Sequence, residues 1–230
     1  MDFNQASFLP EAEQYHEIAA HFVPGYQSLY EIARCYLSLH LPKVADILIV
    51  GAGGGMEIKI LSRFSQQWSF AAVDPSSRML DVAKFWTERS NALNRVQFTE
   101  GFVSDLPSSQ VFDAATCVLV MHFLPDETEK LKLLKDIALR LKTGGILILA
   151  DLAVPKETEE FEVFRQLYST HAEQQGEPEV RIKDILTVLE NFVHPVSNVR
   201  ESELVKLAGF NTPTMFFSSI WFKAWFALKE

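Results

Sequence analysis

The stretch that decides the fold runs from Asp46 to Leu61 and reads DILIVGAGGGMEIKIL. A short β-branched run, Ile47–Val50, precedes the glycines, and Met56–Phe64 carries apolar residues at helical spacing after them. Residues 51–55 hold four of the 10 glycines in the chain. Fixing a glycine costs backbone entropy, so this cluster indicates a tight turn between a strand and a helix. Such a turn lets a ligand approach the backbone and leaves the N–H groups of the helix N-terminus free to donate.

Strand-like and helix-like runs alternate on both sides of this turn. Short apolar runs predict strands at residues 47–50, 70–73, 96–99, 114–120 and 146–150. Helical spacing predicts helices at residues 11–22, 26–40 and 56–64, at a run capped by Ser76, and at a run from Asp126 that stops at Gly144-Gly145. Apolar strands that alternate with amphipathic helices are typical of a parallel sheet with helices on both faces.

The alternation of strand-like and helix-like runs stops after Asp151. Residues 156–195 are more polar and helical in pattern, with a break at residues 176–178, and we expect them to cap the carboxyl edge of the sheet. Residues 201–209 predict a further helix. Two aromatic-rich strands joined near Ser219 are predicted in the last stretch, TPTMFFSSIWFKAWFALK. Aromatic residues at such spacing usually belong to the core, although those of the cap and tail could also enclose a small apolar substrate.

The composition is that of an ordinary globular protein, with 48% hydrophobic and 22% charged residues in a chain of 230. A net charge of −9 argues against direct nucleic-acid binding, which needs concentrated Lys and Arg. We expect no membrane segment and no signal peptide, because no long apolar run and no basic leader is present. Cys35 and Cys117 are isolated, which favours a cytoplasmic protein with free thiols, and no spacing points to a metal site.

The glycine turn alone leaves several kinds of ligand open. A dinucleotide fold wants a third glycine at position 56, where this chain has Met56, so a nicotinamide-dependent oxidoreductase is disfavoured. Asp74 ends the next predicted strand, where a carboxylate can accept both hydroxyls of a ribose. A tight turn without any ligand, and an Asp-Pro-Ser helix cap without any ribose, remain the simpler interpretations.

Five stretches occur in an order and at a spacing that resemble the class I S-adenosylmethionine-dependent methyltransferases. They are ILIVGAGGG, AAVDPSSRML, EGFVSDLP, FDAATCVLVMHFL and LKTGGILILAD, and together they span residues 47–151. Three looser stretches, HFVPGYQSLYEIA, LENFV and KLAGF, resemble a narrower branch, the carboxy-S-adenosylmethionine synthases and their methyltransferase relatives. The resemblance to this branch covers nearly the whole chain.

The resemblance implies an α/β fold of the class I methyltransferase (Rossmann-like) type. Its seven-stranded, mostly parallel sheet has an antiparallel last strand, and a helical N-terminal arm and a helical cap are added to it. We expect one domain over residues 1–230. Its parts are N-terminal helices at 1–42, the cofactor-binding core at 43–151, the cap at 152–200, and a C-terminal helix and strands at 201–230.

The resemblance also implies the cofactor, S-adenosyl-L-methionine, with S-adenosyl-L-homocysteine as product. The residues expected to bind it are Tyr26, Gly51, Ala52, Gly53, Gly55, Asp74, Pro75, Ser76, Phe102, Val103, Ser104, Val118 and Leu119. The chain departs from the family at two positions that are usually acidic, Ile49 and Phe102. Phe102 could pack against the purine instead.

Methyl transfer to a small neutral or cationic acceptor is the expected function. In such an in-line displacement the protein must align the accepting atom, the methyl group and the sulfur, and must exclude water. A general base helps when the accepting atom carries a proton. His122 follows the fourth predicted strand and is the best candidate for that base. A histidine at the end of a strand is also often a packed residue, so both interpretations stay open.

Two other functions compete with this one. The first is a carboxy-S-adenosylmethionine synthase acting in tRNA modification without touching RNA. In that branch an Arg before the Ala-Gly-Phe run holds the extra carboxylate, whereas this chain has Glu203 and Leu204 near that position, with Arg200 one helical turn away. The second is a non-catalytic, cofactor-binding relative acting as a partner subunit. A small-molecule substrate and a homodimer are the expected partners.

Overall fold

The computed structural model describes residue 4, residues 10–125 and residues 127–230. Seven strands form one sheet in the order β3-β2-β1-β4-β5-β7-β6. Their bounds are Ala45–Val50 (β1), Trp68–Asp74 (β2), Val96–Glu100 (β3), Phe112–Val118 (β4), Leu141–Leu152 (β5), Thr214–Ser219 (β6) and Phe222–Leu228 (β7). Strands β1 to β5 pair in parallel, and β7 runs antiparallel to both β5 and β6. The predicted sheet, with its antiparallel last strand, is therefore confirmed.

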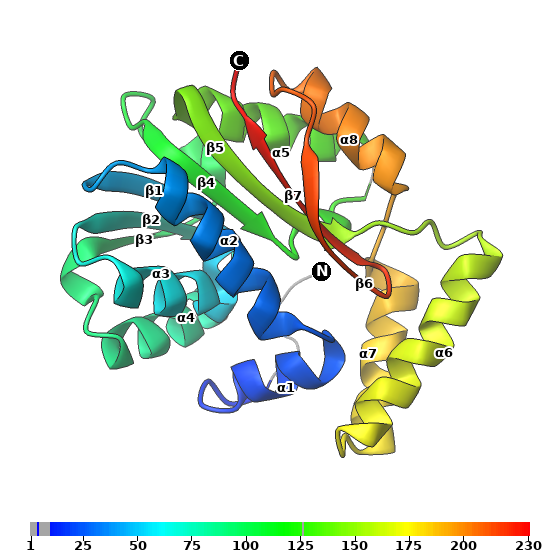
Figure 1. Cartoon of the computed structure of the whole chain (residues 1–230). Coiled ribbons are helices and arrows are strands. Elements are labelled where there is room, and N and C mark those ends of the chain that lie inside the picture. Colours follow the sequence, from blue (N-terminus) through cyan, green and yellow to red (C-terminus); the bar gives the residue numbers. More distant parts are fainter. Residues whose placement is uncertain (1–3, 5–9, 126) are drawn as a thin grey trace.

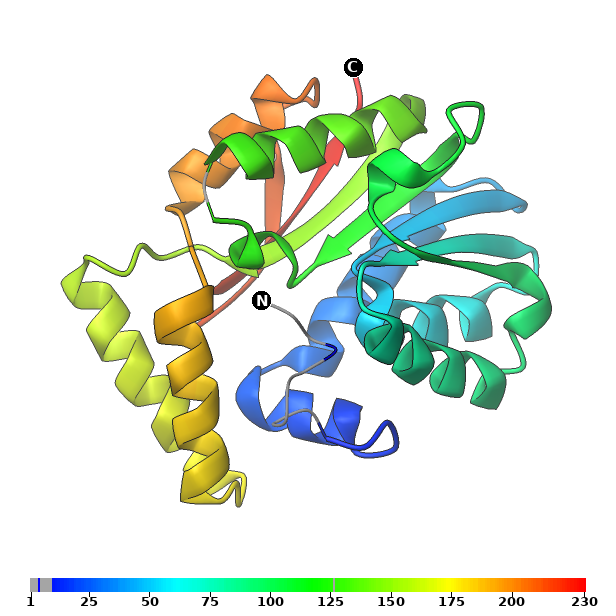
Figure 2. The same ribbon diagram turned by 180° about the vertical axis from the view of Figure 1, so that it is seen from behind.

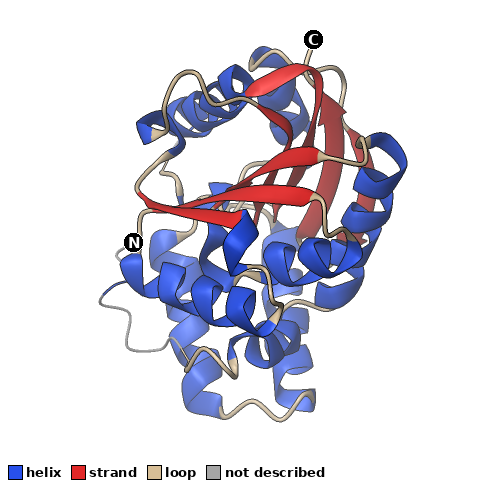
Figure 3. Ribbon diagram, turned by 90° about the vertical axis from the view of Figure 1, so that its left-hand side faces the viewer, coloured by secondary structure: helices blue, strands red, loops and turns tan. Residues whose placement is uncertain are grey.

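Helices cover both faces of the sheet (Figures 1 and 3). Their bounds are Tyr15–Phe22 (α1), Tyr26–His40 (α2), Met56–Phe64 (α3), Ser77–Arg89 (α4), Glu127–Arg140 (α5), Glu159–Gln174 (α6), Glu179–Phe192 (α7) and Asn198–Leu207 (α8). Helices α2 and α3 pack on one face, whereas α5 and α8 pack on the other, which Figure 2 shows from behind. No helix in the described part of the chain is long and apolar enough to cross a membrane.

Strand β1 shows why the apolar run of the sequence is continuous. Ile47 and Ile49 belong to the apolar cluster beneath α2 and α3, and Leu48 belongs to the cluster beneath α5 and α8. All three side chains are fully buried. Because both faces of a parallel sheet are covered, neither alternate set of side chains meets water.

Several predicted boundaries are wrong. Helix α1 begins at Tyr15 rather than at residue 11, and β4 ends at Val118 because Leu119 takes a positive φ of 59°. Helix α5 ends at Arg140, and the Gly144-Gly145 pair lies inside β5 instead of ending the helix. There the Gly144 N–H donates to the Lys229 carbonyl at 2.9 Å, so the C-terminus of the chain holds this end of the strand. The predicted cap residue Asp126 lies outside the described residues.

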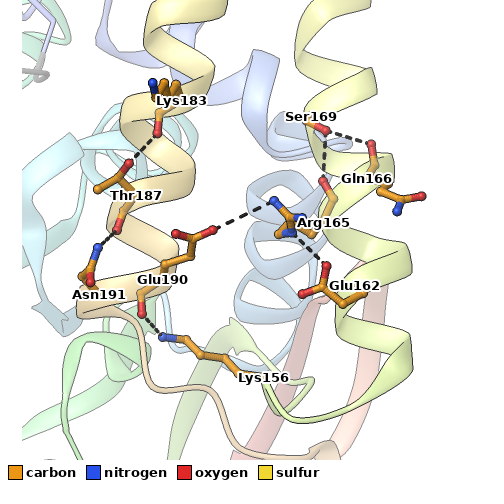
Figure 4. A network of polar contacts seen from close by, with 9 residues as sticks. All are labelled: Lys156, Glu162, Arg165, Gln166, Ser169, Lys183, Thr187, Glu190 and Asn191. Carbon is orange, nitrogen blue, oxygen red and sulfur yellow. Dashed lines mark hydrogen bonds and ion pairs between the residues drawn. The ribbon is translucent and has the colours of Figure 1, made fainter.

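The N-terminal arm and the cap meet at one end of the sheet. Helices α6 and α7 lie side by side, with an Arg165–Glu190 ion pair at 3.9 Å between them (Figure 4). Lys156, which precedes α6, also donates from Nζ to the Glu190 carbonyl of α7 at 2.7 Å. Helix α1 packs on α6, where the rings of Phe22 and Tyr168 lie 5.6 Å apart. Trp221 is fully buried beneath this contact. The cap is therefore fixed by core packing as well as by polar contacts.

Candidate active site

The glycine turn joins β1 to α3 and leaves no room for side chains at its glycines. Gly51 and Gly55 have positive φ values of 68° and 66°, which L-residues rarely adopt. A Cβ at Gly51 would lie 2.2 Å from the Val120 side chain, and one at Gly55 would lie 2.9 Å from the Ala83 backbone. The turn is therefore packed against both the end of β4 and helix α4.

A cavity of about 700 Å³ opens beside this turn, at the carboxyl ends of β1, β2 and β4. Ligand pockets commonly have volumes of about 300–1,000 Å³. The predicted site residues that line it are Tyr26, Gly51, Gly53, Asp74, Pro75, Phe102, Val103, Ser104, Val118, Leu119 and His122. The structure thus brings together eleven residues that are far apart in the sequence. Ala52, Gly55 and Ser76 do not line the cavity and lie behind it, in the turn and at the start of α4.

Asp74, at the end of β2, faces the glycine turn. Its Oδ2 accepts the Gly53 N–H at 3.0 Å, and its Oδ1 accepts the Ser76 N–H at 2.9 Å. Burial raises the pKa of Asp74, and these two hydrogen bonds oppose that shift. A Cβ at Gly53 would lie 3.1 Å from Asp74 Oδ2 and 2.7 Å from the Met79 side chain. Ser76 caps α4 by accepting the Met79 N–H, as predicted.

Phe102 lies at the rim of the cavity, where its side chain is 62% exposed. The acid three residues later is not aimed at the cavity, since Asp105 Oδ2 accepts the Phe102 N–H at 2.8 Å. Asp105 thus fixes the turn that presents Phe102. The large apolar surface that Phe102 exposes is available to a flat ligand.

His122 lies in a short turn after β4 and is 5% exposed. Its Nδ1 pairs with Asp151 at the end of β5, and its backbone N–H also donates to the same carboxylate at 3.1 Å. Burial alone would raise the pKa of Asp151, but the adjacent His122 holds it below its usual value. Because Asp151 is ionised, Nδ1 carries the proton of this contact, and in the neutral form of the imidazole Nε2 is the acceptor nitrogen.

A fully buried lysine supports this pair. Lys130 Nζ donates to the Met121 carbonyl and lies 3.9 Å from Asp151 Oδ2. Glu201 of α8 is also fully buried nearby. Burial first, and the charge of Asp151 second, raise the pKa of Glu201 well above its usual value, so this carboxyl keeps its proton.

Two residues of the site were missed in the sequence. Asp151 stands in the stretch LILAD, and its position at the end of the strand next to β4 was the available signal. Glu57 follows the glycine turn by two residues, is 5% exposed and lines the cavity. Burial raises the pKa of Glu57 to about 7. No pattern in the sequence distinguishes this acid from an ordinary residue in the first turn of a helix.

The wall of the cavity that α7 and β7 form is mostly apolar. Helix α7 contributes Ile185, Val188 and Leu189, and Phe222 comes from β7. Arg181 also lines the cavity, and its guanidinium pairs with Glu177 at 2.7 Å. No group of acids, histidines and cysteines in the described ranges could hold a metal ion.

The stretch that holds the glycine turn, Asp74 and His122 also matches a known protein family. Residues 47–145 match the sequence model of a family described as "Methyltransferase domain". Residues 47–145, less than half of the chain, therefore carry the features of a methyltransferase domain, on a sheet with the observed strand order. S-adenosylmethionine is the cofactor that a domain of this kind implies.

Curated relatives match over most of the chain. A carboxy-S-adenosyl-L-methionine synthase of Desulfotalea psychrophila is 23% identical, covering 90% of this chain and 84% of its own. A synthase of the same name from Dichelobacter nodosus is 27% identical, covering 90% of this chain and 85% of its own. These matches agree with the branch that the looser stretches of sequence indicated.

Solved structures with the same fold include small-molecule methyltransferases. An O-methyltransferase family 2 protein from Planctomyces limnophilus, in complex with apigenin, superposes with a TM-score of 0.61 at 14% identity. The match covers 98% of this chain and 64% of that protein. At this identity the comparison shows the fold, and this chain spans less than two thirds of that protein's length.

Proposed function

We propose that this chain transfers a methyl group from S-adenosylmethionine to a small, largely apolar acceptor, with His122 as general base. The observation that most supports the proposal is the His122–Asp151 pair, which leaves Nε2 as acceptor on a side chain that lines the cavity. The mostly apolar residues of α7 and β7 supply walls for an apolar acceptor. A homodimer, a cytoplasmic location and the boundaries of the four segments stay predictions from the sequence.

The residues around the glycine turn fit the cofactor. Gly51 and Gly53 have no space for a Cβ, and Asp74 presents a buried carboxylate beside them. Asp74 would hold the ribose hydroxyls, and Phe102 and Val103 would contact the adenine. When bound, S-adenosylmethionine supplies a methyl group on a positively charged sulfur. The protein's own contribution is to align the acceptor and keep water out, while Nε2 of His122 takes the acceptor's proton and Asp151 stabilises the charge that forms.

The first experiment identifies the ligand and the acceptor. Mass spectrometry of small molecules released from the purified protein should detect S-adenosylmethionine or S-adenosylhomocysteine. Incubation with methyl-labelled S-adenosylmethionine and a panel of small phenols, alcohols and amines should then label one class. If the protein binds neither form of the cofactor in calorimetry, the proposal fails.

The second experiment tests His122. We expect His122→Ala to lower the rate of methyl transfer about 10²-fold or more while the Kd for S-adenosylhomocysteine stays nearly unchanged. His40→Ala, at an exposed histidine that ends α2, is the matched control and should keep the wild-type rate. A loss of stability without a specific loss of rate would mean that His122 is only a packed residue.

A carboxy-S-adenosylmethionine synthase is the second candidate function. The names of the curated relatives favour it. A carboxylate added to the cofactor would need a cation, and Arg181 is a guanidinium that lines the cavity. Arg181 is already paired with Glu177, and Lys132, which also lines the cavity, is an exposed residue of α5. This is why we prefer methyl transfer.

A further inference from the structure

Glu57 is a buried acid that has no counter-charge among the described residues. It is the second residue of α3, directly after the glycine turn, and it lines the cavity. Its Oε1 is buried without a hydrogen-bond partner. Among the residues that the structure describes, none forms an ion pair with it. The backbone N–H of Glu57 itself bonds to the carboxyl, but burying the other oxygen without a partner costs free energy, so a ligand group is expected to complete this site.

The groups that face Glu57 select a positive charge. Its titratable neighbours are Tyr15 of α1, Tyr26 and Tyr30 of α2, and Cys117 of β4, a thiol whose pKa burial raises. Burial raises the pKa of each tyrosine, that of Tyr15 to about 12, so their hydroxyls stay neutral and can donate or accept. Three aromatic rings and one carboxyl in an apolar pocket are a favourable surrounding for an ammonium group. A ligand carboxylate at the same place would be repelled once Glu57 ionises.

We propose that Glu57 binds the ammonium group at the amino-acid end of the bound cofactor. This inference rests on the proposed function. Glu57 belongs to the same strand–turn–helix unit as Gly51 and Gly53, whereas His122 and the apolar walls come from other elements. Tyr15 also lies at the turn, since a Cβ at Gly54 would be 2.9 Å from its ring. This position on the cofactor's side of the cavity favours the cofactor over the acceptor as the source of the ammonium group.

The pKa of Glu57 supports the same assignment. At a pKa of about 7 the carboxyl is partly protonated near neutral pH, so an incoming cation has only to displace that proton. Burial of the Glu57 carboxyl lowers the stability of the ligand-free protein. Replacing Glu57 by an uncharged residue of the same shape should therefore leave the ligand-free fold at least as stable as the wild type.

The test compares two ligands by calorimetry at pH 8. They are S-adenosylhomocysteine and the analogue that lacks only its α-amino group. We expect Glu57→Gln to weaken binding of S-adenosylhomocysteine about tenfold or more, as for a hydrogen bond to a charged group, and to leave the Kd of the analogue within about twofold. Glu57→Asp keeps the charge and should lose less. Glu88→Gln removes an exposed acid of α4 and is the control.

The possible outcomes separate this inference from the proposed function. If wild type binds S-adenosylhomocysteine and Glu57→Gln binds it equally well, the inference is wrong and the methyltransferase assignment stands. An equal loss of both ligands, or a lowered unfolding temperature of ligand-free Glu57→Gln, would make Glu57 a structural residue and also overturn it. Unchanged cofactor affinity with lost methylation of an amine acceptor would place the ammonium group on the acceptor instead. If wild type binds neither ligand, both proposals fail.

Discussion

Asp151 determines which nitrogen of His122 is free. We expect Asp151→Asn to lower the rate of methyl transfer about 10²-fold, because the neutral amide no longer stabilises a charged imidazole. The Kd for S-adenosylhomocysteine should not change, because Asp151 does not line the cavity. Steady-state rates and calorimetry on the same samples check both expectations.

The matched control for this prediction is Glu201→Gln. Glu201 keeps its proton in the fold, so an amide replaces one neutral buried group by another. Its raised pKa also means that the wild-type fold loses stability as the pH rises above the usual carboxyl value, and the amide variant avoids this loss. If both variants lose activity equally, the effect of Asp151 is one of packing.

Asp74 and Gly53 are the residues whose variants test the cofactor site. Asp74→Ala should weaken binding of S-adenosylhomocysteine by about 1.5–3 kcal/mol, the range for hydrogen bonds to a charged group. Gly53→Val should abolish binding, because even a Cβ there meets Met79 and Asp74. Calorimetry measures both, and Asp81→Ala, at an exposed acid of α4, serves as control. Normal binding by both variants would show that the site is wrongly assigned.

At the scale of the element, local pattern predicted most but not all of the chain. The bounds of α2 and α3 agree with their helical spacing, because each begins next to a glycine and buries one apolar stripe. The end of α5 was mispredicted because Gly144-Gly145 resembles a helix stop. Pairing of the strand with Lys229, which is distant in sequence, outweighs that local signal.

The site was predictable to the same degree. The glycine turn, Asp74 and His122 stand at strand ends, which sequence order reveals. The role of Glu57 depends on its Oε1 having no hydrogen-bond partner. The role of Asp151 depends on its contact with His122, which follows the neighbouring strand β4. Both features depend on residues that are distant in the sequence, so no spacing in the sequence predicts them.

Helix α1 is attached to the glycine turn by a histidine that stays neutral. His16 Nε2 bonds to the Gly54 carbonyl at 2.6 Å, and its ring stacks on Trp86 at 4.4 Å. Burial lowers its pKa to about 4, the Gly54 carbonyl opposes this shift, and Lys59 adds to it. The unfolded chain takes up a proton near pH 6.5 and the fold does not, so the stability that His16 contributes is lost as the pH falls from 6.5 towards 4.

We therefore expect the difference in unfolding free energy between wild type and His16→Gln to shrink by about 2 kcal/mol between pH 7 and pH 5. Glutamine can still donate to the Gly54 carbonyl but does not titrate. Urea unfolding at the two pH values measures the difference, and His40→Gln is the control. A difference that is the same at both pH values would contradict the assigned state of His16.

Across the whole molecule, the cavity joins three segments that the sequence presents separately. The arm contributes Tyr26, the core contributes the glycine turn and His122, and the cap contributes α7 with Arg181. The resemblance placed the possible carboxylate contact near Arg200, Glu203 and Leu204. Arg200 instead pairs with Glu203 at 2.8 Å, and none of the three lines the cavity. Which cation faces the ligand thus depends on how the cap folds over the sheet.

This arrangement leads to the last prediction, which separates the two candidate reactions. A carboxylated cofactor would bring a second carboxylate into a cavity that already holds Glu57 and Asp74. Arg181 is bound by Glu177, whose other oxygen accepts from His21 at 2.7 Å, so its charge is already largely balanced. We expect incubation with S-adenosylmethionine and prephenate to give no carboxylated product by mass spectrometry. If that product forms and is lost in Arg181→Ala, but remains in Arg200→Ala, the chain is a synthase that holds the carboxylate from its cap, and the methyltransferase proposal is wrong.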